Sequence, residues 1–231
     1  MRLAIFAATG GIGTQLLAQA LAGGHSVTAV VRNPAKLGDH AGRDDAAGRD
    51  VHVVTADLSA PDPEVLARAV KGADAVLSGF GPRGRADAGH TGSGTRAIVE
   101  AMRTSGVRRI VAVSAAPVST TPSPGRPHPP RHDPGDGTFM RYVAAPLGQF
   151  FLGKVFADVA VMEDVLRDSG LDWTVVRPPR LTDKPFTGSY RTAADRNLKG
   201  GFSVPRADVA HLMLSCLTDP ATVHHALGVA T

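Results

Sequence analysis

Short apolar runs rich in β-branched residues alternate along this chain with longer stretches in which apolar residues recur at helical spacing. This alternation is typical of βαβ units and predicts a parallel sheet. Most of the short runs lack polar alternation, as expected for strands that are covered on both faces. We predict strands at residues 3–7, 26–31, 51–55, 75–78, 109–113, 173–177 and 226–230.

The helical stretches lie between these runs and carry recognisable end signals. Asp62 can cap the helix that follows it, with Pro63 in the first helical position. Gly106 and Gly170 each follow a helical stretch directly, where glycine commonly ends a helix. We predict helices at residues 11–22, 63–70, 91–105, 156–169 and 206–217.

Two segments interrupt this rhythm. Residues 38–50 are polar and glycine-rich and predict an exposed loop, whereas residues 117–137 are rich in proline and form either a linker or a lid. The lid is favoured because the segment follows the fifth strand, and ligands of open α/β sheets bind outside the carboxyl ends of the strands. The apolar, partly helical residues 138–160 would cover a substrate pocket or form a dimer face. The length of the chain suits a single domain spanning residues 1–231.

Composition excludes several classes of protein. The formal net charge is only +4, the basic residues are scattered and aromatic residues are few, so we expect no nucleic-acid binding. No apolar run is long enough to cross a membrane. Cys216, the one cysteine, lies in an apolar stretch and is expected to be buried rather than nucleophilic. We expect a cytoplasmic monomer or homodimer that acts on a small molecule.

The first predicted strand–helix junction carries a glycine pattern typical of dinucleotide binding. Gly10 and Gly13 have the spacing of the last two glycines of that fingerprint, and Ala7 occupies the place of the first. Gly10 would let the backbone approach a pyrophosphate, and Gly13 would let the helix pack closely on the strand. The free N–H groups of the helix N-terminus would then bind the phosphates.

The second and third strands end in residues suited to the adenosine half of a coenzyme. Arg32 stands where an NAD site would carry a carboxylate, and a guanidinium fits a 2′-phosphate, with Asn33 and Lys36 nearby. We therefore predict that NADP(H) is preferred over NAD(H), although Arg32 is also consistent with an exposed residue at a strand end. Asp57 could reach the adenine edge or cap the following turn.

Gly79, Phe80 and Gly81 follow the fourth strand, where small residues let the backbone run close to a coenzyme. Ser114 ends the fifth strand and Pro178, Pro179 and Arg180 follow the sixth, at the edge of the sheet where the nicotinamide should lie.

The chain lacks the Tyr-x-x-x-Lys pair of conventional short-chain dehydrogenases. Tyr142 and Tyr190 are followed four residues later by Pro146 and Ala194. Tyr142 could act from the segment after the proline-rich stretch or could simply pack at an interface. No pattern of cysteines and histidines predicts a metal site, and no nucleophile elbow predicts a hydrolase.

These residues lie in stretches that resemble the atypical short-chain dehydrogenase/reductases of the NmrA-like kind, and among them the biliverdin reductase B (flavin reductase) branch. The matching stretches are LAIFAATGGIG, VVRNPAKL, GTRAIVEAMRTSGVRRIVAVSA, VMEDVLRDSGLDWTVVRPPRLTDKPFTGSYR and RADVAHLMLSCL. The resemblance implies a Rossmann-type, doubly wound, mostly parallel sheet of about seven strands with helices on both faces. It leaves out the proline-rich insertion and the segment that follows.

The resemblance also implies a set of contacts to an NADP(H) coenzyme. The implied residues are Thr9, Gly10, Gly11, Ile12, Gly13, Arg32, Asn33, Asp57, Leu58, Gly79, Phe80, Gly81, Ser114, Pro178 and Pro179. Three positions depart from the flavin-reductase pattern: Ala7 replaces the first glycine, the serine after the fifth strand is shifted to the pair Ser114-Ala115, and Arg180 replaces a histidine. Because an arginine does not release a proton near neutral pH, a flavin or biliverdin substrate does not follow from the resemblance.

From these features we predict an NADPH-dependent reductase that transfers hydride to a planar conjugated acceptor such as a flavin, a quinone or an enone. Such acceptors delocalise negative charge and need little acid catalysis, consistent with the missing Tyr/Lys pair. The catalytic candidates are Ser114, which would hydrogen-bond the nicotinamide or the acceptor, Arg180, which would stabilise developing charge, and Tyr142. Two alternatives stay open: an NADP(H)-sensing regulatory protein without turnover, and a specialised biosynthetic reductase or isomerase.

Overall fold

The computed structural model describes residues 1–40, 51–82, 84, 89–138, 141–142 and 145–231. The strands of this part of the chain are β1 (Arg2–Phe6), β2 (Ser26–Val31), β3 (Val51–Thr55), β4 (Ala75–Ser78), β5 (Arg109–Val113), β6 (Asp172–Arg177), β7 (Arg180–Thr182), β8 (Arg191–Ala194), β9 (Ser203–Pro205) and β10 (His225–Ala230). Its α-helices are α1 (Gly11–Ala22), α2 (Pro63–Val70), α3 (His90–Ser105), α4 (Ala145–Arg167) and α5 (Arg206–Ser215).

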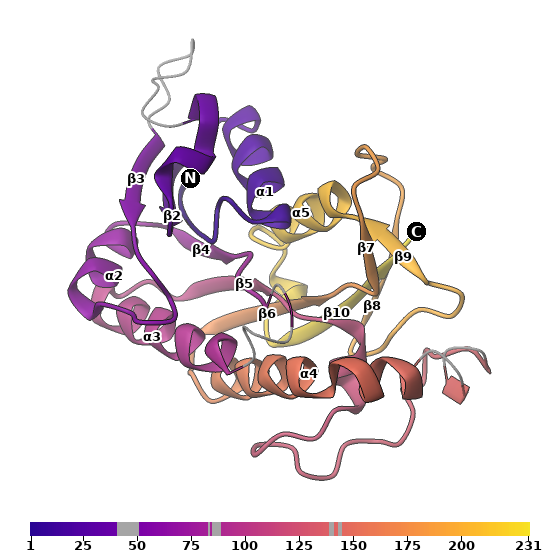
Figure 1. Ribbon diagram of the computed structural model, residues 1–231. Helices are drawn as coiled ribbons and strands as arrows, with labels where there is room; N and C mark the ends of the chain where they lie inside the picture. The colour runs from indigo at the N-terminus through magenta and orange to yellow at the C-terminus, as the bar shows by residue number, and fades with distance from the viewer. Residues whose placement is uncertain (41–50, 83, 85–88, 139–140, 143–144) are drawn as a thin grey trace.

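The central sheet has the order β3-β2-β1-β4-β5-β6-β10-β8 and is visible at the centre of Figure 1. Its strands pair in parallel, except that β8 runs antiparallel to β10. β1 pairs with β2 on one side and with β4 on the other, so the strand order reverses at this point. In open α/β sheets, this switch point opens a crevice outside the carboxyl ends of the strands.

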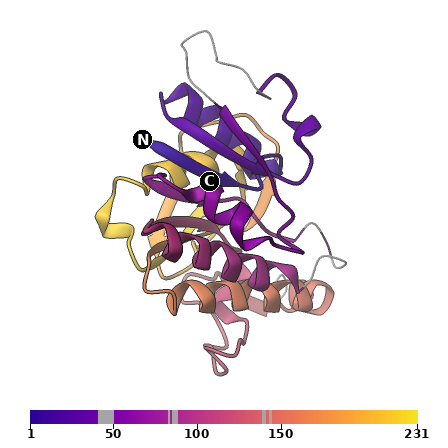
Figure 2. The same cartoon turned by 90° about the vertical axis from the view of Figure 1, so that its left-hand side faces the viewer.

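Helices cover both faces of the sheet. α1 and α5 pack together on one face, and α2, α3 and α4 line the other, with α3 and α4 running side by side (Figures 1 and 2). Each face has its own apolar core: Leu16 and Met213 are fully buried on the α1/α5 side, and Leu66 and Met102 on the α2/α3/α4 side. The doubly wound Rossmann fold predicted from the sequence is therefore confirmed.

Predicted and observed elements differ mainly in number and at their ends. The predicted sheet of about seven strands gains β8, whose polar and largely exposed residues gave no strand signal. A small parallel sheet of β7 and β9 was also not predicted, because each strand is only three residues long. Asp62 caps α2 as predicted, accepting hydrogen bonds from the backbone N–H groups of Glu64 at 2.9 Å and Val65 at 3.3 Å.

Two predicted segments are described only in part. The loop predicted at 38–50 falls mostly on residues 41–50, which lie outside the described residues, and Pro34–His40 form a 3₁₀ helix before it. In the predicted covering segment at 138–160, residues 139–140 and 143–144 also lie outside them. α4 begins at Ala145, whereas the predicted helix began at residue 156. Leu147 and Phe150 in its first turns are exposed, so the apolar residues of this part do not mark one buried face as those of a packed helix do. Within the described part of the chain, no helix is long and apolar enough to cross a membrane.

Candidate active site

The turn between β1 and α1 is a tight backbone cradle. Ala7 has a positive φ of 56°, and its carbonyl oxygen accepts a hydrogen bond from the Gly10 N–H at 2.8 Å. A methyl group on Gly13 would lie 2.0 Å from that same oxygen, so only glycine fits there. α1 has no side-chain cap and no acidic residue in its first turn. Its first N–H groups therefore remain available to an anion, as the glycine pattern predicted.

The end of β4 lies against this cradle. The Gly79 N–H donates to the Phe6 carbonyl oxygen at 3.1 Å, and a methyl group on Gly79 would lie 3.2 Å from the Gly13 nitrogen. The Phe80 ring packs on Gly94 of α3, where a methyl group would lie 2.7 Å from the ring. Gly94 carried no signal of this role in the sequence, because the contact joins two segments that are distant along the chain.

The residues predicted to contact the adenosine half of the coenzyme follow β2 and β3. Arg32 is exposed just beyond β2, and the Asn33 side-chain oxygen accepts a hydrogen bond from the Ala35 N–H at 3.0 Å. Asp57 accepts hydrogen bonds from the Ser59 N–H at 2.9 Å and the Ser59 hydroxyl at 2.7 Å. These hydrogen bonds, with a smaller contribution from the Arg32 charge, lower the pKa of Asp57.

Asp57 therefore caps a turn in this structure, which is one of the two roles that the sequence left open. The other residues predicted to contact this part of the coenzyme differ in exposure. Ile12 and Leu58 are buried, whereas Thr9 and Gly10 are half-buried and Gly11 is exposed.

Ser114 lies in a buried polar network beneath the carboxyl ends of β5 and β6. Its hydroxyl donates to Glu163 of α4 at 2.6 Å, and Glu163 is held by Arg177 at 2.8 Å and by Arg167. Burial alone would raise the pKa of Glu163, but the hydrogen bonds and charge of Arg177, with those of Ser114 and Arg167, outweigh it and lower that pKa. An ionised carboxylate only accepts hydrogen bonds, so the hydroxyl proton of Ser114 points toward Glu163. Only its lone pairs remain for a ligand.

Glu163 and Arg177 were not predicted as site residues. Both lie in apolar stretches, VMEDVL and WTVVR, where the only available signal was charge within an otherwise apolar element. Such a residue requires a buried partner. The sequence does not show that Glu163 and Arg177 pair with each other.

A cavity of about 690 Å³ opens at the carboxyl ends of β5, β6 and β10. Its lining includes Pro178, Pro179 and Arg180, which were predicted to face the nicotinamide. The rest of the wall is Ala115, Ala116, Pro117, Ser119, Thr120, Asp136, Gly137, Thr138, Leu152, Phe156, Arg177, Asn197, Leu198, Lys199, Gly200, Gly201, Phe202, Gly228, Val229 and Ala230. Most of the lining residues present apolar side chains or backbone to the cavity, and a few present polar groups, as is usual for a small-molecule site.

The proline-rich segment supplies one wall of this cavity and is fixed to the opposite loop. The Asp133 carboxylate accepts hydrogen bonds from the Asn197 and Gly135 N–H groups, both at 2.8 Å. A methyl group on Gly135 would lie 1.8 Å from the Asn197 carbonyl oxygen, so the two backbones touch. Asp136 accepts a hydrogen bond from the Asn197 side chain at 2.9 Å, and burial raises the pKa of Asp136. Among the described residues, Asp136 is thus the one acidic residue of the cavity wall.

Tyr142 lies away from the cavity wall. Its side chain is 66% exposed, and its ring centroid is 5.9 Å from that of His132. Arg180, in contrast, reaches the cavity from β7, and within the described residues its guanidinium has no ion-pair partner. Cys216 is buried, as predicted, and burial raises the pKa of its thiol to about 11, so it is protonated at neutral pH. No cluster of metal-binding side chains occurs in the part of the chain that the structure describes.

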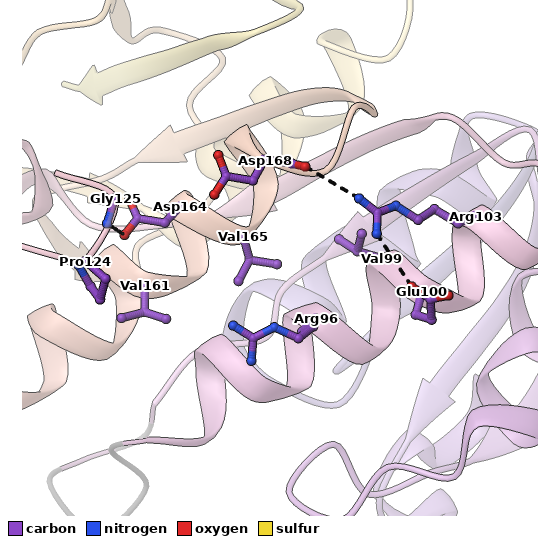
Figure 3. A pocket seen from close by; sticks show the side chains of 10 residues that line it. All are labelled: Arg96, Val99, Glu100, Arg103, Pro124, Gly125, Val161, Asp164, Val165 and Asp168. Atoms are coloured by element: carbon purple, nitrogen blue, oxygen red, sulfur yellow. Dashed lines mark hydrogen bonds and ion pairs between the residues drawn. The ribbon is translucent and has the colours of Figure 1, made fainter.

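A second hollow, of about 440 Å³, lies between α3 and α4 (Figure 3). None of the predicted site residues lines it. Asp164 is engaged by the Gly125 N–H and by Arg167, both at 2.9 Å, and Arg103 forms an ion pair with Glu100 at 3.6 Å. Most of its charged side chains are therefore satisfied by neighbouring groups, and the hollow adds nothing to the site.

The doubly wound sheet, the glycine cradle and the cavity at the same edge define a nicotinamide-dinucleotide-binding protein of the Rossmann class. A sequence profile for NAD(P)H-binding proteins matches residues 7–220. The chain belongs to this NAD(P)H-binding family. The NAD(P)H-binding family predicted from the sequence is therefore confirmed.

Individual relatives are distant. The chain is 29% identical over 209 residues to the uncharacterized sugar epimerase YhfK of Bacillus subtilis, covering 89% of this chain and 82% of that one. A short-chain dehydrogenase/reductase from Veillonella parvula, solved in complex with NADP, superposes with a TM-score of 0.76 at 20% identity over 100% of this chain and 94% of the other. ChuY, an anaerobillin reductase from Escherichia coli O157:H7, superposes with a TM-score of 0.70 at 24% identity over 99% and 97%. These two solved structures support the fold.

Proposed function

We propose that the protein is an NADPH-dependent reductase that transfers hydride to a planar conjugated acceptor bound in the cavity beside β5 and β6. The observation that carries this proposal is that Pro178 and Pro179, the predicted nicotinamide wall, line a largely apolar cavity of about 690 Å³. A flat ring system fits such walls, and the cavity lies at the carboxyl ends of β5, β6 and β10, the edge of the sheet at which the loop after β1 also lies.

The residues of the cleft fit a nicotinamide dinucleotide. The Ala7 carbonyl oxygen leaves no room for a side chain at Gly13, and the N-terminus of α1, which has no side-chain cap, would bind a pyrophosphate. Arg32 is exposed beyond β2, where it would bind the 2′-phosphate that distinguishes NADPH from NADH. When bound, the coenzyme supplies the hydride.

The chain's own groups then orient the acceptor and compensate its charge. Ser114 can accept a hydrogen bond but has its proton committed to Glu163, which suits holding a carboxamide N–H rather than donating a proton. Arg180 and Lys199 line the cavity without ion-pair partners among the described residues, so they would stabilise negative charge on the acceptor. Among the structural neighbours, ChuY is an anaerobillin reductase, which supports a reductase function.

The test is acceptor-dependent oxidation of NADPH, followed by the absorbance of the reduced nicotinamide. The panel contains FMN, riboflavin, quinones, enones and a linear tetrapyrrole. We expect saturable turnover with at least one of them, faster with NADPH than with NADH. Tight NADPH binding without turnover on any acceptor would instead favour the NADP(H)-sensing alternative.

A further inference from the structure

Arg206, the first residue of α5, lies on the glycine cradle of α1. A methyl group placed on Gly11 would lie 2.7 Å from the Arg206 Nε and 2.8 Å from its Cδ. The two helices are joined nearby, where the Gln19 side chain donates to the Ala207 carbonyl oxygen at 2.9 Å, and Figure 1 shows α1 and α5 side by side. The guanidinium therefore comes from the far end of the chain to the loop that faces the coenzyme phosphates.

The electrostatics of this position are unbalanced. A cation at the N-terminus of a helix is unfavourable, and Arg206 lies at the N-terminus of α5 while also facing that of α1. Its ion-pair partner among the described residues is Asp183, at 2.5 Å, and the Asp183 side chain is 89% exposed. Such an exposed pair contributes little energy.

The carboxylate of Asp208, two residues further along α5, is buried and is engaged by another loop. Asp208 accepts hydrogen bonds from the Thr187 N–H at 2.9 Å, the Gly188 N–H at 3.1 Å and the Thr187 hydroxyl at 2.6 Å. These bonds hold the loop that follows Asp183. The junction of α1 and α5 thus combines two helix N-termini and a guanidinium with one solvent-exposed counter-charge, which is an arrangement that favours an added anion.

We propose that Arg206 binds the pyrophosphate of the coenzyme, and that Asp183 occupies its guanidinium until the coenzyme enters. The inference rests on the proposed function in taking this anion to be a nicotinamide dinucleotide. The guanidinium fork fits phosphate oxygens, and only one of its nitrogens is engaged by Asp183. Arg206 then sets the affinity for both coenzymes, whereas Arg32 sets the preference between them.

The experiment measures dissociation constants of NADPH and NADH by fluorescence titration, with the Tm of each free protein. Arg206→Ala should weaken both coenzymes by a similar factor of about ten to a hundred, the effect of losing a charged hydrogen bond. Arg206→Lys should retain part of the affinity. Asp183→Asn should bind both coenzymes at least as tightly as the wild type, since a competing anion is removed.

Two further variants separate this role from others. Arg32→Asp should weaken NADPH far more than NADH. Arg68→Ala, an exposed arginine in the last turn of α2, should leave both constants unchanged and controls for the loss of one positive charge.

Wild-type affinity for both coenzymes in Arg206→Ala would overturn the inference while leaving the proposed function intact. A loss of affinity in Arg206→Ala that is confined to NADPH would also overturn it. So would an equal loss of affinity in Asp183→Asn, because that result would show that the Arg206–Asp183 ion pair has a structural role. If Arg206→Ala lowers the Tm of the free protein, the Arg206→Lys variant is used in its place. Wild-type affinity for the coenzymes in folded Arg206→Lys, together with weakened binding in Asp183→Asn, would overturn the inference. A wild type that binds neither coenzyme would overturn the proposed function itself.

Discussion

At the scale of the residue, Gly13 is where the smallest change has the clearest consequence. Gly13→Ala forces a methyl group against the Ala7 carbonyl oxygen, which is backbone and cannot move aside. We expect a loss of about 3 kcal/mol in the free energy of unfolding, measured by urea denaturation without coenzyme. Gly81→Ala is the matched control, because nothing lies within 4 Å of its added methyl group, and it should change stability by less than about 1 kcal/mol. Equal stabilities of the two variants would contradict the tight cradle.

A second prediction at this scale concerns the buried pair of Glu163 and Arg177. Glu163→Gln leaves the Arg177 charge buried without its counter-ion and should destabilise the protein by about 3–5 kcal/mol at neutral pH. Glu100→Gln, which removes the exposed partner of Arg103, is the control and should change stability by less than about 1 kcal/mol.

The same pair predicts a pH dependence. The pKa of Glu163 is lowered in the folded protein, so its stabilisation is complete above the unfolded-state pKa of about 4.3 and is lost as pH falls through the lower folded value. The difference in unfolding free energy between wild type and Glu163→Gln should therefore shrink as the pH falls below about 4. A difference that stays constant across that range would show that Glu163 is not ionised in the native state.

At the scale of the element, the docking of residues 133–137 on the loop at Asn197 shapes the cavity that we propose binds the acceptor. Gly135→Ala would push the two backbones apart, whereas Gly137→Ala would meet only the Lys199 side chain, at 3.8 Å. We expect Gly135→Ala to raise the KM for the acceptor about tenfold through misplacement of the cavity wall, with the dissociation constant of NADPH unchanged. Gly137→Ala should behave like the wild type. A similar KM in all three proteins would show that this wall does not contact the acceptor.

The sequence predicted the elements whose signals are local. The β-branched runs marked the buried parallel strands, and the glycines after β1 marked the coenzyme loop, because each requirement is met within a few neighbouring residues. β8 was missed because it is polar and takes its order from pairing with β10. Glu163 and Arg206 were missed because their partners, Ser114, Arg177 and Gly11, are distant along the chain.

At the scale of the whole molecule, the glycine cradle after β1 and the cavity of about 690 Å³ lie at the same edge of the sheet, where its parallel strands end. The Ser114 N–H donates to the Val176 carbonyl oxygen at 2.7 Å, and the Ala116 N–H donates to the Pro178 carbonyl oxygen at 2.9 Å. These bonds fix the chain after β5 to the chain after β6. The predicted nicotinamide wall and the cavity wall are therefore parts of the same rigid structure, which is the basis for assigning both to one reaction.

The most direct test of this account is the rate of acceptor-dependent NADPH oxidation in a variant with a partly filled cavity. Leu152→Trp enlarges a side chain of the cavity wall, and Leu147→Trp makes the same change on α4 at an exposed residue outside that wall. The account predicts that Leu152→Trp lowers kcat/KM for the acceptor at least about tenfold with the NADPH dissociation constant unchanged, and that Leu147→Trp matches the wild type. Equal turnover in all three proteins, or no turnover in the wild type with any acceptor, would contradict it.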